Sequence, residues 1–134
     1  MKWLLLMLAA AFCSCQEEAE ITHYKDLEQN MMDLKIYQEN LGDQVKAKNL
    51  EDASWFLEGM DSIMQILNKR FKEHHKMKDP FSYHYKREMK EPVDALRQSI
   101  KKNDTAAALR GYRLLVKNCN NCHVDHEIDK EVRF

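Results

Sequence analysis

The chain has 134 residues, which is enough for one domain with a single core and too few for two domains of ordinary size. Hydrophobic residues make up 44% and charged residues 32%, as in soluble helical proteins, and a formal net charge of -1 gives no strong field for nucleic acid. With only 3 Gly and 2 Pro, turns are scarce and long helices are expected. We therefore expect a helical domain and no nucleic-acid partner.

Residues 1–15 are predicted to be an export signal. Lys2 supplies a positive start, and residues 3–12 form an apolar run that is too short for a permanent membrane-spanning helix. An acidic, polar stretch over 16–20 follows at once. The sequence therefore predicts a mature domain over 16–134 that works in the periplasm or on the extracytoplasmic face of a membrane.

The end of this signal resembles that of a bacterial lipoprotein, in which a cysteine after a small residue becomes the lipid-modified N-terminus. Cys15 follows Ser14 and fits that pattern, whereas Cys13 follows the bulky Phe12 and fits it less well. We therefore expect lipid on Cys15, with a membrane as the partner of this end of the chain. An ordinary cleaved signal is the alternative.

Two amphipathic helices are predicted in the first half of the mature domain. The first runs from about 21 to 47, and Gln38 interrupts its apolar stripe. The second opens at Asn49, a good N-cap residue with Asp52 three positions on, and its stripe alternates by three and four without a break, as in bundle helices. The stripes are Leu27, Met31, Leu34, Leu41 and Val45 in the first helix, and Leu50, Ala53, Leu57, Met60, Met64, Leu67 and Phe71 in the second.

Two further helices are predicted in the second half. The third opens at Asp79-Pro80, a cap followed by proline at the first helical position, and Pro92 inside it should kink it. The fourth opens at Asn103-Asp104 and runs through two cysteines. The inward positions are Tyr85, Met89, Val93, Leu96 and Ile100 in the third helix, and Leu109, Tyr112 and Val116 in the fourth, with Cys119 and His123 continuing that spacing. The fold class expected is all-α, a four-helix bundle, with the His123 ring directed to its interior.

The last predicted helix contains one specific motif. Cys119-Asn120-Asn121-Cys122-His123 is the attachment pattern of a c-type haem. Each cysteine thiol adds to one haem vinyl group, and the adjacent His123 supplies an imidazole to the iron. We therefore expect one covalently attached haem c per chain, with His123 as a metal ligand.

Other uses of a cysteine pair fit this sequence less well. A thioredoxin-like redox pair needs a βαβ context, and no strand is predicted. A zinc site needs further ligands at fixed spacing, and a second cysteine pair is missing, although His126 is near enough to be considered. A structural disulfide is disfavoured inside a continuous helix. Haem attachment remains the favoured interpretation.

The position of this motif near the C-terminus, after Leu109-Arg110-Gly111-Tyr112-Arg113-Leu114-Leu115, resembles the class II c-type cytochromes, the cytochrome c-prime family. The resemblance implies an antiparallel up-down-up-down four-helix bundle with haem between the helices near one end. Members of that family often form homodimers, so a homodimer is one expectation for this chain.

A second resemblance concerns the other face of the iron. Residues 26–34 are similar to the first helix of the small periplasmic four-helix b-type cytochrome, whose haem is ligated by a Met from helix one and a His from helix four. This implies that Met31 is the ligand opposite His123. Met31 lies on the core stripe, and Met32 lies one residue round on a flank. The alternative is that Met31 only fills the core, as most of the 8 Met residues must.

The remaining candidates carry less specific signals. At Tyr24-Lys25 c-prime proteins often have Tyr-Arg, so a distal arginine is not expected. Tyr112 should pack against the porphyrin edge or simply in the core. His84 is either a second haem contact or an ordinary helix residue, and His126 is expected on the surface. His74-His75 lies in a basic run that reads as a solvated helix end or, less simply, as a docking patch for a redox partner.

These features lead to three hypotheses of different classes. The first is a monohaem electron carrier with His/Met ligation, which is not an enzyme and exchanges electrons with redox partner proteins that the sequence does not identify. The second is a five-coordinate cytochrome that binds NO or CO. The third is a helical lipoprotein scaffold without haem.

Overall fold

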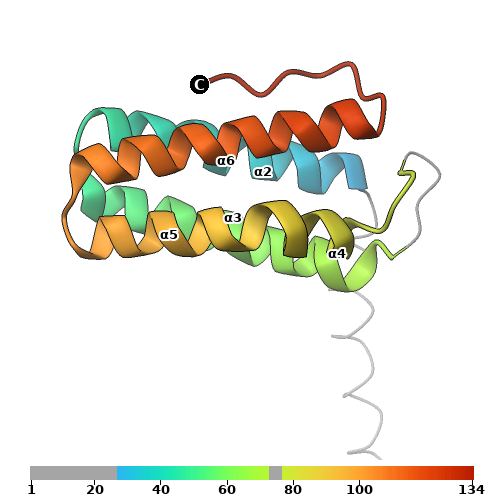
Figure 1. Ribbon diagram of the computed structural model, residues 1–134, viewed down its shortest axis with the longest axis horizontal. Helices are drawn as coiled ribbons and strands as arrows, with labels where there is room; N and C mark the ends of the chain where they lie inside the picture. The colour runs from blue at the N-terminus through green and yellow to red at the C-terminus, as the bar shows by residue number, and fades with distance from the viewer. Residues whose placement is uncertain (1–26, 73–76) are drawn as a thin grey trace, which may run out of the picture.

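The computed structural model describes residues 27–72 and 77–134, and Figure 1 shows them as long helices lying side by side. The described residues form no strand, and none of their helices is long and apolar enough to cross a membrane. The predicted all-helical bundle is confirmed at this level. The elements are α2 (Leu27–Lys46), α3 (Leu50–Arg70), α4 (Phe81–His84), the π-helix η1 (Tyr85–Met89), α5 (Lys90–Lys101) and α6 (Thr105–Asp125).

Segments α4, η1 and α5 follow one another without a break and act as the third helix of the bundle. Contacts join α2 to α3 and α6, and join α5 to α3 and α6, so each of the four packs on two neighbours. The start of α2, the α4–η1 region and the end of α6 lie at one end of the molecule (Figure 1). The last turns of α6, which contain the motif residues, therefore lie at the same end of the molecule as the first turns of α2.

Two of the predicted helix starts are confirmed by their caps. The Asn49 side chain accepts a hydrogen bond from the Asp52 N–H, and the Asp104 side chain accepts one from the Ala107 N–H. Each satisfies a donor that the first turn of a helix leaves free. The third helix begins one residue later than expected, at Phe81, with Pro80 as its cap residue.

The ends of three helices explain how a chain with so few glycines turns. Lys48, Asn103 and Glu127 adopt left-handed backbone conformations, with φ of 61°, 55° and 57°. In each case the N–H of the next residue bonds back to a carbonyl five positions earlier, as at Asn49 to Gln44, 2.9 Å. This is the Schellman type of helix ending, which usually uses glycine. Ordinary side chains therefore occupy positions where the sequence offers no glycine signal.

The predicted disturbance at Pro92 takes the form of a π-helix just before it. Proline has no N–H to bond the carbonyl four residues earlier, and its ring would press on that turn. Here η1 widens the helix over Tyr85–Met89, and the Glu88 carbonyl accepts a hydrogen bond from the Asn118 amide of α6, 2.5 Å. The carbonyl that Pro92 leaves without an intrahelical donor therefore bonds to Asn118, the residue just before Cys119.

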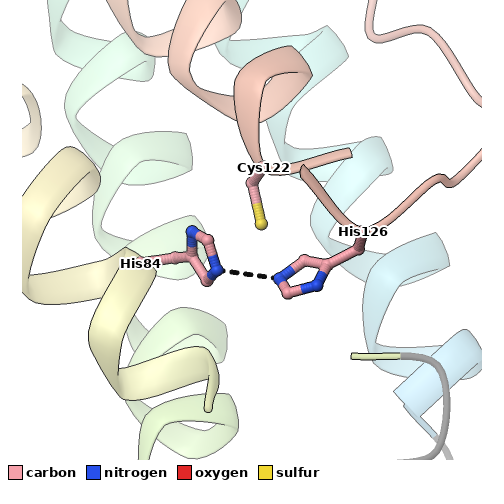
Figure 2. A group of neighbouring side chains, drawn as sticks. All are labelled: His84, Cys122 and His126. Carbon is pink, nitrogen blue, oxygen red and sulfur yellow. Dashed lines mark hydrogen bonds between the residues drawn. The ribbon is translucent and has the colours of Figure 1, made fainter. Parts of the chain in front are cut away.

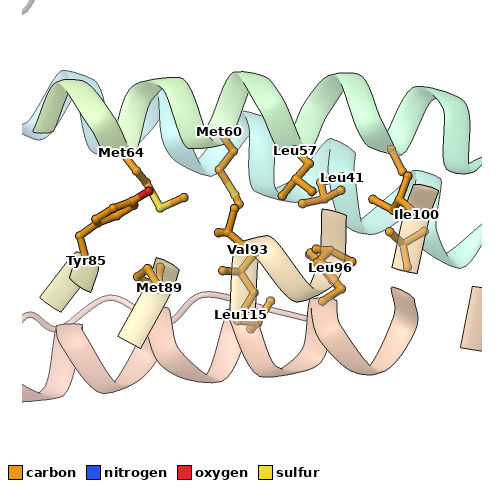
Figure 3. Packing of buried hydrophobic residues seen from close by; sticks show 14 of the residues in the cluster. Leu41, Leu57, Met60, Met64, Tyr85, Met89, Val93, Leu96, Ile100 and Leu115 are labelled. Atoms are coloured by element: carbon orange, nitrogen blue, oxygen red, sulfur yellow. The ribbon is translucent and has the colours of Figure 1, made fainter. Parts of the chain in front are cut away.

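The core follows the predicted stripes closely (Figure 3). Every predicted inward residue of α3 and of the third helix is buried. In α2 the ends of the stripe are buried, and Met31 and Leu34 are partly buried against the core. Gln38 interrupts the stripe in the sequence but is itself buried, because its side-chain amide donates to the Tyr112 hydroxyl and that hydroxyl donates to the Gln38 backbone carbonyl. A buried polar pair thus replaces an apolar contact between α2 and α6.

Gly42 is needed where α2 meets this tyrosine. A Cβ at Gly42 would overlap the Tyr112 ring and hydroxyl, so Gly42→Ala should lower the free energy of unfolding by about 1–3 kcal/mol through overpacking. At Gly111 of α6 a Cβ would lie 3.4 Å from the Leu96 Cβ, an ordinary contact. Gly111→Ala should therefore be neutral or raise stability by up to about 1 kcal/mol, as expected from helix propensity. Urea unfolding of the two variants measures the difference, and equal effects would contradict this account.

Candidate functional site

The two motif cysteines lie in the last two turns of α6 as free thiols. Burial raises the pKa of each to about 12, with the neighbouring Cys122 adding to the effect on Cys119 and Glu88 to that on Cys122. Both sulfurs are therefore protonated at neutral pH. Redox-active Cys-x-x-Cys pairs have the opposite property, a lowered thiol pKa at an exposed helix start. The arrangement does not match a thioredoxin-like site.

His123 lies beside the segment that follows α6. Its ring Nδ1 is 2.7 Å from the Lys130 carbonyl oxygen, which can only accept, so Nδ1 carries the proton and donates. The other ring nitrogen, Nε2, then keeps its lone pair and is available as a ligand. His123 is only partly buried, whereas the helical spacing predicted a ring directed to the bundle interior.

The C-terminal segment, residues 127–134, is itself held in place by side chains of α6 and α2. The Asn120 amide donates to the Val132 carbonyl at 2.9 Å and its oxygen accepts from the Val132 N–H at 2.7 Å. Gln38 donates to the Arg133 carbonyl. The Phe134 ring lies 5.6 Å from that of Tyr112. Asn120 is a variable position of the motif, so its part in holding this segment had no signal in the sequence.

Met31 and Met32 differ as the helical pattern predicted. Met31 is partly buried and packs against the core, whereas Met32 is 50% exposed. Tyr112 is almost completely buried, and its burial raises its pKa to about 12. Because Gln38 occupies its hydroxyl group, Tyr112 offers only the ring to anything bound near Cys119.

No family model, no curated protein and no solved structure matches the chain. The interpretation of this site therefore depends on its own residues and geometry.

The prediction for His126 is wrong. His126 is 6% exposed, and it lies at the C-cap of α6 with its ring 4.5 Å from that of His84, centroid to centroid. His84, at the end of α4, is 2% exposed. Figure 2 shows both rings close to the Cys122 thiol. The structure therefore gathers two histidines and a cysteine that the sequence separates.

Several predicted features lie outside the described residues. The export signal with Cys15, the start of the first predicted helix near 21, and Tyr24-Lys25 belong to residues 1–26. His74-His75 belongs to residues 73–76. The lipid anchor and the docking patch remain predictions.

Proposed function

We propose that the chain is an exported monohaem c-type cytochrome that carries electrons, with haem on Cys119, Cys122 and His123. The observation that carries this proposal is the His123 ring: its Nδ1 proton is committed to the Lys130 carbonyl, so Nε2 is left as the ligand atom. A hydrogen bond of this kind fixes ring orientation and raises ligand basicity at a metal.

The cysteines also suit the attachment chemistry. Each thiol adds across one vinyl group, so that the sulfur bonds to one carbon and the hydrogen ends on the other, with no oxidant required. Free, protonated thiols have the composition that this addition consumes, whereas a disulfide would have to be reduced first. Bound haem supplies an iron that cycles between Fe(II) and Fe(III).

The architecture proposed is an antiparallel up-down-up-down bundle, with haem between the helices at the end that holds the start of α2 and the end of α6. The links 47–49 and 102–104 are short, which favours reversal of direction between neighbouring helices. Gln38 of α2 bonds Tyr112 of α6, and seven residues along each helix from this pair lie Met31 and Cys119. Seven residues span about 10.5 Å of helix, so an antiparallel pair brings Met31 and Cys119 to the same level.

Met31 is the proposed sixth ligand. Its thioether lies on a helix that packs against α6, and its partial burial leaves it closer to the bundle interior than Met32. With Met and His both bound, the iron has two fixed protein ligands, which suits electron transfer more than capture of a gas. Redox partner proteins are the expected partners.

The visible spectrum tests the proposal directly. The full chain should be produced in cells with an intact haem-attachment system and purified in both oxidation states. A low-spin haem spectrum supports the electron carrier. A high-spin spectrum supports the five-coordinate gas-binding alternative, and the absence of haem bands in a fully matured preparation supports the scaffold.

The proposed anchor gives a separate prediction. Cleavage before Cys15 should leave that residue at the new N-terminus, with a diacylglyceryl thioether on its sulfur. Several acyl chains hold a protein on a membrane, whereas one gives only marginal binding. Mass spectrometry of the native N-terminal peptide measures this, and an unmodified peptide that starts at Gln16 would show a soluble exported protein instead.

A further inference from the structure

The region around Cys122 contains two histidines that haem attachment does not use, His84 and His126, and they form a set of potential metal ligands together with the Cys122 sulfur. Nitrogen atoms of His84 and His126 and the Cys122 sulfur all lie within 4.8 Å of one another. They come from three places, the end of α4, the last turn of α6 and its C-cap, and Figure 2 shows them converging on one point. Both imidazoles are buried. This is the donor set, two nitrogens and one sulfur, that thiophilic transition metals prefer.

The hydrogen bonds define where the protons of this cluster lie. The Lys78 N–H donates to His126 Nδ1 at 2.9 Å, so a neutral His126 carries its proton on Nε2. His126 Nε2 is 2.8 Å from His84 Nε2, which must therefore accept. The proton of His84 is then on Nδ1, which faces the Glu88 carboxylate at 3.5 Å. One proton thus lies between two ring nitrogens directed at the same point.

We propose that the haem-free chain binds one thiophilic divalent metal ion, of the Zn²⁺ type, through His84 Nε2, His126 Nε2 and Cys122 Sγ. The ion takes the place of the proton between the rings. That proton moves to His126 Nδ1, so the hydrogen bond from the Lys78 N–H is given up. The Cys122 thiol loses its proton to solvent, which makes metal binding release one proton and strengthen with pH.

The surroundings of His84 support this assignment independently. His84 Nδ1 and Glu88 Oε2 are buried atoms 3.5 Å apart, and neither has a hydrogen-bond partner among the described residues. A ligating histidine typically donates its second ring N–H to a carboxylate, and Glu88 is placed for that role. His84 also immediately precedes the π-helix η1, and π-helical turns are frequent at functional sites.

Only small movements are required to form the site. Metal–nitrogen bonds of about 2.0 Å and a metal–sulfur bond of about 2.3 Å place tetrahedral ligands roughly 3.3–3.6 Å apart. The two Nε2 atoms must separate from 2.8 Å, and the sulfur must approach from within 4.8 Å. We expect side-chain rotations to make both changes, together with a turn of the His126 ring away from the Lys78 N–H. A fourth position stays open for water.

Metal binding and haem attachment exclude each other. A Cys122 sulfur bonded to a haem vinyl carbon is a thioether and cannot be the thiolate ligand. The ion therefore belongs to the chain before haem is attached. This inference does not depend on the proposed function, because it is tested on protein that has never contained haem.

The experiment is a Co²⁺ titration of the reduced, haem-free full chain, followed by displacement with Zn²⁺. One equivalent of Co²⁺ should give tetrahedral visible bands and a thiolate-to-metal band, with release of one proton per ion. Cys122→Ser should abolish the thiolate band, whereas Cys119→Ser, the matched control in the same motif, should keep it. His84→Ala and His126→Ala should each weaken binding at least tenfold, and Glu88→Gln should weaken it by about tenfold, as expected for a residue behind a ligand.

X-ray absorption of the Zn²⁺-loaded unmutated chain provides a test that needs no variant. One sulfur at about 2.3 Å and imidazole nitrogens at about 2.0 Å support the site. Two sulfurs in the coordination shell, no sulfur, or no stoichiometric binding at micromolar metal would overturn it. Loss of the thiolate band in the Cys119→Ser variant, with its helical circular dichroism intact, would do the same.

Discussion

Haem in the matured protein should remain with the polypeptide after extraction with acidified organic solvent. The thioether bonds at Cys119 and Cys122 survive conditions that break iron–histidine ligation. The expected result is complete retention in the unmutated chain and complete loss in the Cys119→Ser/Cys122→Ser double variant. Absorbance of the two phases after extraction measures it.

Single variants refine this result. Cys119→Ser and Cys122→Ser should each retain at most one linkage. His123→Ala should disturb iron ligation without removing either attachment site, so it serves as the matched control for covalent retention. Movement of haem from the unmutated chain into the organic phase would contradict thioether attachment.

Replacement of Met31 should change the spin state of the iron. A thioether is a soft ligand that favours Fe(II), so His/Met ligation raises the reduction potential and closes the iron to weak external ligands. The unmutated ferrous protein should therefore be low-spin and react slowly with CO. Met31→Ala should make it high-spin and reactive with CO. Visible spectra recorded after mixing with CO measure both properties.

Met32→Ala is the matched control for this prediction. Met32 is adjacent in sequence and of the same type, but it is 50% exposed on the flank of α2. Its removal should change neither the spin state nor the reaction with CO. If the unmutated ferrous protein is already high-spin and binds CO immediately, the electron-carrier proposal loses its main support and the gas-binding cytochrome replaces it.

The helices and their inward faces could be predicted from the sequence because they depend on local spacing. The stripe from Leu50 to Phe71 is buried throughout, and the caps at Asn49 and Asp104 form the expected hydrogen bonds. The helix ends at Lys48, Asn103 and Glu127 gave no such signal, because ordinary residues there adopt the conformation that glycine usually marks. A helix end can be predicted from the sequence only where the residue type matches the backbone conformation.

In the candidate site, too, the features that depend on local sequence could be predicted. The sequence by itself determined the motif from Cys119 to His123, because its chemistry depends on neighbouring residues with a fixed gap. It also placed Met31 inward and Met32 outward, because helical geometry fixes adjacent side chains about 100° apart.

Only the tertiary structure decided the contacts between distant parts of the chain. The Gln38–Tyr112 pair joins residues 74 positions apart, and the His84–His126 pair joins residues 42 positions apart. Burial makes a polar group find a partner, but the sequence does not say which one, because the partner depends on how the helices pack. The Lys130 carbonyl that orients His123 is a backbone atom, common to every residue type, so only the path of the folded chain could place it there.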